Sequence, residues 1–80
     1  MPSPEYSDYG RKKKIQGTVV LSIIVTPEGT ARNIQVTKSL EPSLDKKAIE
    51  CVSEWKFKPG TRDGAPVAMR ITVETNFRLY

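Results

Sequence analysis

The sequence GTVVLSIIVTPEG, residues 17–29, decides the fold because it combines a strand pattern with a tight turn. Alternate residues of a strand face the same side, and one such row here is wholly apolar. The residues of this row are Val19, Leu21, Ile23 and Val25. Pro27 presets φ for a turn, and Gly29 can adopt the left-handed conformation that returns the chain. The stretch predicts a core-facing strand over residues 17–25 that leads into a hairpin.

The hairpin predicts a second strand, from Thr30 to about Lys38. Ile34 and Val36 alternate as a strand requires, but Ala31 is out of phase with them. One extra residue near Arg32-Asn33, a β-bulge, would restore the alternation.

A helix is predicted after the second strand. Pro42 can occupy the first turn of a helix, where its missing N–H costs nothing. Apolar residues then recur at helical spacing, at Leu44, Ala48, Cys51, Val52 and Trp55. The helix is expected to end before Pro59, and Gly60 through Pro66, which contains Asp63-Gly64, is interpreted as a loop.

The last predicted strand, residues 67–77, is the most regular element of the sequence. Its first row of side chains comprises Val67, Met69, Ile71, Val73, Thr75 and Phe77. Its second row comprises Ala68, Arg70, Thr72, Glu74 and Asn76. The first row is expected to face the core with the apolar row of residues 17–25.

These elements predict an α+β fold with the order β-β-α-β. Because a helix connects the second strand to the last one, these two strands are expected to be parallel, with a right-handed crossover. Placing the first strand between them, antiparallel to both, gives a three-stranded antiparallel or mixed sheet in the order 2-1-3. The helix then packs on one face of the sheet. Residues 1–16 are interpreted as a lead-in segment with a short helical turn, and residues 17–80 as the domain.

The composition excludes several classes of function. The 80 residues include no histidine and one cysteine, so no Ser-His-Asp or Cys-His arrangement, internal disulfide or thiol-based zinc site can form. The acidic residues follow no metal-binding or paired-carboxylate pattern, and no phosphate-binding loop is present. A mean hydropathy of -0.43 predicts no membrane span, and the start Met1-Pro2-Ser3-Pro4 predicts no signal peptide. We expect a small binding module that is not an enzyme and takes no cofactor.

The net charge of +4 comes from one short run. Arg11, Lys12, Lys13 and Lys14 are consecutive, and the rest of the chain is neutral. A protein that binds nucleic acid usually spreads its cations over a whole face, so nucleic acid is not expected as a partner. The run could be a solvated lead-in, or it could contact an acidic partner surface or anionic lipid headgroups. A small basic module that binds nucleic acid through Arg11–Lys14 is the last alternative.

The order 2-1-3 leaves the last strand at an edge of the sheet. Few charges or prolines protect this edge, and its free N–H and C=O groups could accept an added strand. An extended peptide could therefore dock there, a second copy of the chain could pair there, or the edge could simply be tolerated.

Several short motifs occur in an order that resembles the C-terminal domain of the TonB family of energy transducers. They are Pro4-Glu5-Tyr6, Lys14-Ile15-Gln16-Gly17, Pro27-Glu28-Gly29, Leu44-Asp45 with Ala48 and Val52, Trp55-Lys56-Phe57-Lys58-Pro59, Asp63-Gly64-Ala65-Pro66-Val67 and Phe77. The alternation in residues 19–25 also matches. The resemblance covers nearly the whole chain, and the Trp-x-Phe-x-Pro step after the helix is its most specific part.

The resemblance implies a periplasmic domain of a protein that an N-terminal helix anchors in the inner membrane. In that family the anchor works with ExbB and ExbD, which use the proton-motive force. The C-terminal domain binds the Ton box, an extended segment of an outer-membrane transporter, as a strand added beside its last strand, and transmits force to it.

Carried onto this chain, the resemblance implies a set of partner-binding residues. They are Tyr6, Val67, Ala68, Met69, Arg70, Ile71, Thr72, Val73, Glu74, Thr75, Asn76 and Phe77. Tyr6 matches the first residue of the family's Tyr-Pro signature, but Ser7 replaces the proline. Members of the family also form homodimers in isolation.

Overall fold

Two helices and five strands make up residues 4–79, which are the residues that the computed structural model describes. In chain order they are α1 (Asp8–Lys12), β1 (Gly17–Val25), β2 (Ala31–Lys38), α2 (Pro42–Ser53), β3 (Gly60–Arg62), β4 (Ala65–Val67) and β5 (Met69–Phe77). The predicted short helical turn of the lead-in corresponds to α1. The first three residues of that lead-in and the last residue of the predicted domain lie outside the described residues.

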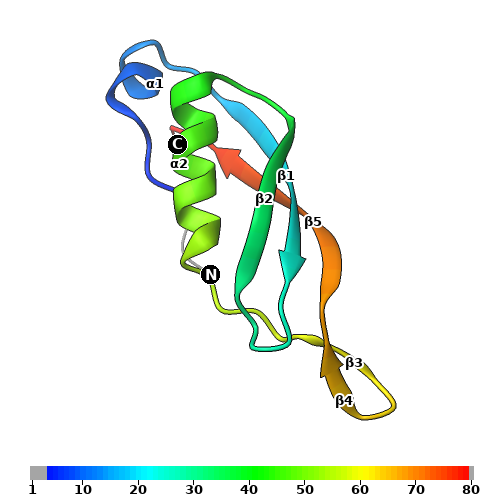
Figure 1. The fold of residues 1–80 in the computed structure, drawn as a ribbon. Coiled ribbons are helices and arrows are strands. Elements are labelled where there is room, and N and C mark those ends of the chain that lie inside the picture. Colours follow the sequence, from blue (N-terminus) through cyan, green and yellow to red (C-terminus); the bar gives the residue numbers. More distant parts are fainter. Residues whose placement is uncertain (1–3, 80) are drawn as a thin grey trace.

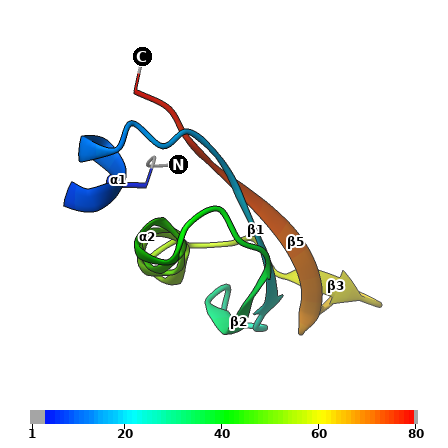
Figure 2. The same ribbon diagram turned by 90° about the horizontal axis from the view of Figure 1, so that it is seen from above.

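One sheet and one helix form the body of the molecule. The sheet has the order β2-β1-β5, and β1 is antiparallel to both neighbours. Helix α2 lies across one face of this sheet (Figures 1 and 2), and within residues 4–79 no element covers the opposite face. The predicted α+β class, the order 2-1-3 and the single covering helix are therefore confirmed.

The core lies between α2 and the sheet. Eight apolar side chains of the described residues are at most 3% exposed: Val19, Leu21, Ile23 and Val25 of β1, Leu44, Ala48 and Val52 of α2, and Phe77 of β5. The central strand contributes its whole apolar row because it has a neighbour on both sides as well as α2 above it. The row predicted from residues 17–29 is thus the centre of the core.

Strand β2 is irregular at two points. Between the pairs Ile24↔Arg32 and Ser22↔Gln35, β2 contains one residue more than β1, and Asn33 there has a φ of 53°. This is the bulge predicted near Arg32-Asn33. A second shift brings Thr37 out of register, and its Oγ1 donates a hydrogen bond to the Val20 carbonyl at 3.2 Å. The second shift was not predicted, because no apolar residue near it is out of phase.

The segment from Gly60 to Pro66, predicted to be a loop, instead contains a second hairpin. Strands β3 and β4 pair from Gly60↔Val67 to Arg62↔Ala65. The two residues between them, Asp63 and Gly64, have φ values of 52° and 82°, as a tight two-residue hairpin turn requires. Figure 1 shows this hairpin projecting from the end of the sheet opposite to α1.

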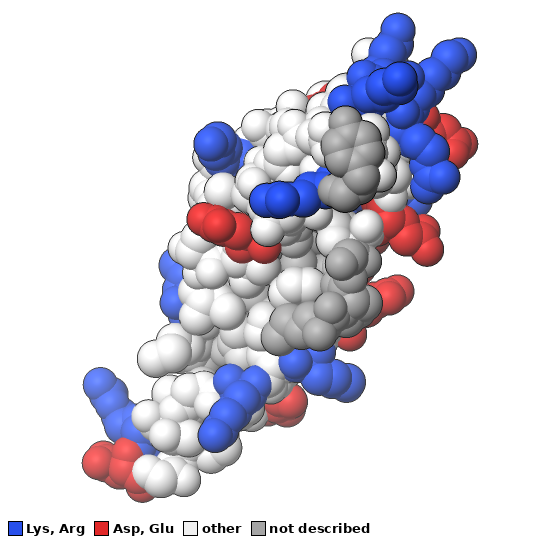
Figure 3. All heavy atoms as spheres, turned by 180° about the vertical axis from the view of Figure 1, so that it is seen from behind, with Lys and Arg blue, Asp and Glu red and all other residues white. Residues whose placement is uncertain are grey.

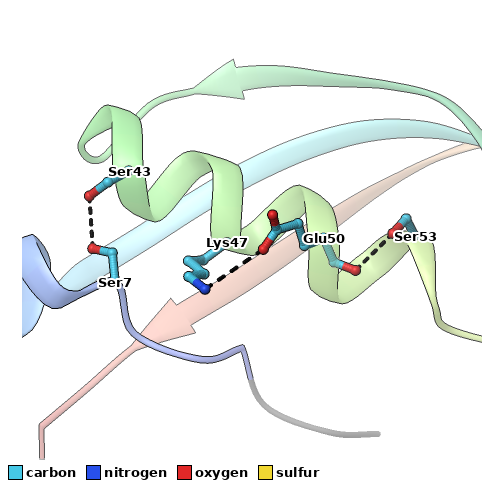
Figure 4. A network of polar contacts seen from close by, with 5 residues as sticks. All are labelled: Ser7, Ser43, Lys47, Glu50 and Ser53. Carbon is cyan, nitrogen blue, oxygen red and sulfur yellow. Dashed lines mark hydrogen bonds and ion pairs between the residues drawn. The ribbon is translucent and has the colours of Figure 1, made fainter.

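The lead-in is attached to the start of α2 by a chain of hydroxyl hydrogen bonds. Ser7 is the N-cap of α1, where its Oγ accepts from the Gly10 N–H at 2.9 Å. The Ser7 and Ser43 hydroxyl oxygens lie 2.7 Å apart (Figure 4), and Ser43 donates to the Glu41 carboxylate. Ser7 is consequently the donor to Ser43. Farther along α2, Lys47 and Glu50 form an ion pair on the exposed face.

Glu41 is the N-cap of α2. Its hydrogen bonds at this position lower its pKa, so the charge state of its carboxyl group affects the stability of the domain. Its carboxylate accepts from the N–H groups of Ser43 and Leu44, each at 3.1 Å. The Ser43 hydroxyl is the main cause that lowers the pKa of Glu41; the two backbone N–H groups add to it, while partial desolvation and Asp45 oppose it. Because the folded pKa is lowered, the stabilisation is present above the unfolded pKa and is lost as the pH falls through the folded value.

We therefore expect Glu41→Gln to melt at a lower temperature than the unsubstituted chain at pH 7. The difference should shrink below about pH 4, the ordinary range of a glutamate. Thermal unfolding followed by circular dichroism at pH 7, 5 and 3 measures this. Glu28→Gln, in the exposed turn after β1, is the control for the loss of one negative charge. A difference independent of pH would contradict the role of the Glu41 charge.

Candidate functional site

Strand β5 is an open edge of the sheet. It pairs with β1 along all nine residues, from Gly17↔Phe77 to Val25↔Met69, without a register shift. On its other side it has no strand partner within residues 4–79. In an antiparallel strand the N–H and C=O groups of alternate residues point to opposite sides. About half of the backbone groups of β5 are therefore available to an added strand.

The two edges of the sheet differ in how well they are protected. Strand β2 has two register shifts and the twisted backbone that goes with them, which is one way in which proteins prevent edge-to-edge association. Strand β5 has neither shift nor proline. Of the two edges, β5 is thus the one suited to strand addition.

The two faces of β5 offer different chemistry. On the side of α2, Ile71 and Val73 are half-buried, and Thr75 and Phe77 are buried. The other row is exposed and comprises Arg70, Thr72, Glu74 and Asn76. An added strand would continue both surfaces, with apolar side chains beside Ile71 and Val73 and polar side chains on the other face.

Two residues of the predicted contact strand, Val67 and Ala68, lie outside β5, and Met69, which was expected to face the core, is not buried. The predicted strand over residues 67–77 is interrupted at Ala68, because Val67 pairs with Gly60 across the small hairpin whereas Met69 pairs with Val25. Met69 is 50% exposed and not part of the core, since β5 lacks an outer neighbour at this point in the described chain. The edge available within the main sheet is therefore Met69–Phe77.

Tyr6 lies at the other end of β5 from Met69, against the core. Its ring meets the Phe77 ring edge-on, with centroids 5.4 Å apart and planes at 79°, and its hydroxyl donates to the Ile15 carbonyl at 2.8 Å. Tyr6 thereby fixes the lead-in beside the end of the open edge. A contact between Tyr6 and a docked segment stays a prediction.

Long charged side chains flank the apolar residues on the uncovered face of the sheet. Ile24 pairs with Arg32 on one side and Arg70 on the other, and Val20 pairs with Lys38 and Glu74. Both apolar residues are only half-exposed or less. The aliphatic stems of such side chains can cover apolar surface while their charges stay in water, which is how a one-layer sheet tolerates these residues.

The positive charge is concentrated at the end of the molecule that carries α1. Figure 3 shows Lys and Arg gathered there, whereas the rest of that face mixes both signs. All four cations of the run, Arg11, Lys12, Lys13 and Lys14, are exposed. The run begins in the last turn of α1 and continues into the residues after it. None of them forms an ion pair with a described residue.

A polar cavity at the end of β5 was not predicted from the sequence. It lies between the start of β1 and the end of β5, and Gln16 and Arg78, just outside the two strands, contribute to it. Gln16 continues the row of Thr18, and Arg78 continues the row of Asn76. This alternation was the only signal in the sequence that could have indicated the cavity. Residues 4–79 contain no cluster of three or more Cys, Asp or Glu suited to a metal ion. The same residues form no helix of the length and hydropathy that a bilayer span needs.

Comparison with known proteins identifies the family. The model of the family described as "Gram-negative bacterial TonB protein C-terminal" matches residues 2–79. The chain belongs to the TonB C-terminal domain family. It is 38% identical to Protein TonB of Vibrio cholerae over 95% of this chain and 32% of that protein. It is 34% identical to Protein TonB of Xanthomonas campestris over 99% of this chain and 36% of that protein.

A solved structure supports the same assignment. The solution NMR structure of the TonB CTD of Pseudomonas aeruginosa matches with a TM-score of 0.80 and 26% identity, over 99% of this chain and 81% of that one. The resemblance to the TonB family stated from the sequence motifs is thus confirmed. The TonB C-terminal domain is a non-enzymatic interaction domain, as predicted. The chain spans about a third of the length of the curated TonB relatives that it matches.

Ser7 has a structural role in the lead-in of this family member. Ser7, which stands where the sequence resemblance led us to expect proline, caps α1 and bonds to Ser43. A proline has no side-chain oxygen for either bond. A proline at position 7 would therefore remove both of these side-chain hydrogen bonds of the lead-in.

Proposed function

We propose that this chain is the part of a TonB-like energy transducer that binds an outer-membrane transporter. In this proposal the Ton box of the transporter docks as a strand on the open edge of β5, residues 69–77. The observation that carries it is the contrast between the two sheet edges: β5 is regular and unpartnered in the described chain, whereas β2 is interrupted twice. Membership of the TonB family supports the class of partner.

The wider role rests on parts of the protein outside this chain. We place the domain in the periplasm, on a protein anchored in the inner membrane, with ExbB and ExbD acting through the anchoring part. The domain would then transmit force derived from the proton-motive force to the docked transporter segment.

Titration of the isotopically labelled protein with a synthetic Ton box peptide tests the docking. We expect the backbone amide signals of residues 69–77 to shift, with smaller changes at β1, because strand addition forms hydrogen bonds along β5. Shifts confined to α1 or to the uncovered face of the sheet would contradict the proposal.

N-methylation of the peptide distinguishes strand addition from side-chain contacts. Only alternate N–H groups of the peptide would face β5, so methyl groups at positions of one parity should weaken binding about tenfold or more. Methyl groups at the other parity are the matched control and should change affinity little. Equal effects at both parities would show that the peptide does not bind as a strand.

A second copy of the chain is the competing occupant of the same edge. An antiparallel pairing of two β5 strands centred on Thr72 would place Arg70 of each copy opposite Glu74 of the other. Sedimentation at several concentrations measures this pairing. A monomer that binds the peptide supports transporter docking, whereas a dimer that excludes the peptide at all accessible concentrations would overturn it.

A further inference from the structure

The cavity lies at the Phe77 end of β5, on the side where β5 meets β1. Its volume is about 410 Å³, and it is lined by Gln16, Gly17, Thr18, Asn76, Phe77 and Arg78. Thr18 and Asn76 are a cross-strand pair in the exposed row of the sheet, the row that faces away from α2. A strand added to β5 would place its own exposed row about 5 Å from Asn76. A side chain near one end of a docked segment can therefore reach the cavity.

The polar side chains of the cavity offer mainly hydrogen-bond donors. The Asn76 Oδ1 accepts from the Thr18 hydroxyl at 2.7 Å, and the Gln16 Oε1 accepts from the Leu79 N–H at 3.1 Å. Each amide oxygen thus already accepts one hydrogen bond and keeps one further lone pair, while both NH₂ groups are left to donate. Arg78, with five N–H donors, has no carboxylate partner among residues 4–79. Donors therefore outnumber acceptors at this site, which favours a ligand that accepts hydrogen bonds and carries negative charge.

The surrounding charge has the same sign. The run Arg11–Lys14 ends two residues before Gln16, and α1 lies at the end of the sheet where β5 finishes (Figure 1). Glu74, two residues before Asn76 in the same row, is the acidic group on this part of β5. A cation-rich end of the molecule raises the local concentration of anions and strengthens the preference for a carboxylate.

We propose that this cavity binds a carboxylate carried by an acidic side chain of the segment docked on β5. This inference rests on the proposed function and adds a specificity rule to it. An exposed site with one guanidinium binds a free carboxylate weakly, but a carboxylate on a docked strand has an effective concentration of about millimolar or more. The acidic residue lies in the exposed row of the segment, at the end beside Arg78. The apolar residues of the segment lie in the other row, beside Ile71 and Val73.

A double-mutant cycle between peptide and protein tests the rule. The exposed-row residue at each end of the Ton box peptide is replaced in turn by Glu or Gln, so that both docking directions are covered. At the end of the peptide that lies beside Arg78, we expect the peptide with Glu to bind about fivefold to tenfold more tightly than the peptide with Gln. Arg78→Gln should reduce this ratio to near one. Arg62→Gln, at an exposed arginine in β3 outside the docking edge, is the matched control and should leave the ratio in place.

Each outcome bears on one of the two claims. If no peptide binds, the docking on β5 is wrong. If the peptides bind but Glu and Gln are equivalent in the unsubstituted protein, the carboxylate site is wrong and the docking stands. A Glu preference that persists in Arg78→Gln also overturns the carboxylate site, because the cations of Arg11–Lys14 would then account for it.

Sodium acetate is the probe for a free carboxylate. We expect acetate at the peptide's concentrations to leave the side-chain signals of Gln16, Asn76 and Arg78 nearly unchanged. Saturation of these signals by acetate at the same concentration as the Glu peptide would contradict a site that depends on a docked segment.

Discussion

Phe77→Ala is expected to lower the free energy of unfolding by about 3–5 kcal/mol, the range for a buried phenylalanine replaced by alanine. Phe77 has the largest of the fully buried side chains and is 1% exposed. It closes the core at the end of β5 and supports the ring of Tyr6, so its removal leaves a cavity under the lead-in. A domain of this size has a total stability of about 5–15 kcal/mol, and the variant could be largely unfolded.

Urea unfolding followed by the fluorescence of Trp55, which packs against the core, measures the effect. Met69→Ala is the matched control on the same strand, because its side chain is half-exposed, and it should cost less than about 1 kcal/mol. Phe77→Leu keeps most of the volume and gives a folded variant if the alanine form does not fold. A loss below about 1 kcal/mol for Phe77→Ala would mean that Tyr6 collapses into the vacated space.

Gly29→Ala is expected to cost about 2–3 kcal/mol because two separate constraints meet at this residue. Its φ of 85° strains any residue with a Cβ by about 1–2 kcal/mol. A Cβ would also lie 2.4 Å from the Phe57 carbonyl oxygen, and the Phe57 N–H donates to the Gly29 carbonyl at 2.8 Å. The added methyl group must push these two backbones apart and weaken that hydrogen bond, at a further cost of about 1 kcal/mol.

Gly64→Ala separates the two constraints. Gly64 has a similar φ of 82°, but nothing lies within 4 Å of a Cβ there. It should therefore lose only the conformational part, about 1–2 kcal/mol. Thermal unfolding resolves the difference, because 1 kcal/mol corresponds to about 4–8 °C in a domain of this size. Equal losses in both variants would show that the approach of Phe57 to Gly29 contributes nothing.

The sequence predicts the sheet well because the apolar row of β1 identifies the buried face of that strand. Its four-residue apolar row, the Pro27-Gly29 turn and the helical spacing from Leu44 to Val52 leave one compact arrangement, and the structure has it. The bulge at Asn33 was predictable because it brings Ala31 back into phase. The shift at Thr37 moves no apolar residue, so nothing in the residue pattern indicates it.

The hairpin of β3 and β4 was missed for a different reason. Asp63-Gly64 is a strong turn signal, but the strands beside it are three residues long and exposed, without an alternating apolar row. Such strands depend on backbone pairing that periodicity does not detect. The open edge of β5 followed from the predicted strand order. The cavity at its end did not, because the residues that line it are far apart in the sequence and only the folded sheet brings them together.

Strand β1 pairs with β2, which is close to it in the sequence, and with β5, which is distant. This difference determines the order in which the two edges of the sheet form. The pairing of β1 with β2 joins residues close in the chain, whereas the pairs from Gly17↔Phe77 to Val25↔Met69 close much longer loops. Contacts of high sequence separation form slowly, so we expect β5 to join the sheet late in folding. The open edge of β5 would then be the last part of the domain to form. Only a completely synthesised and folded chain could offer it.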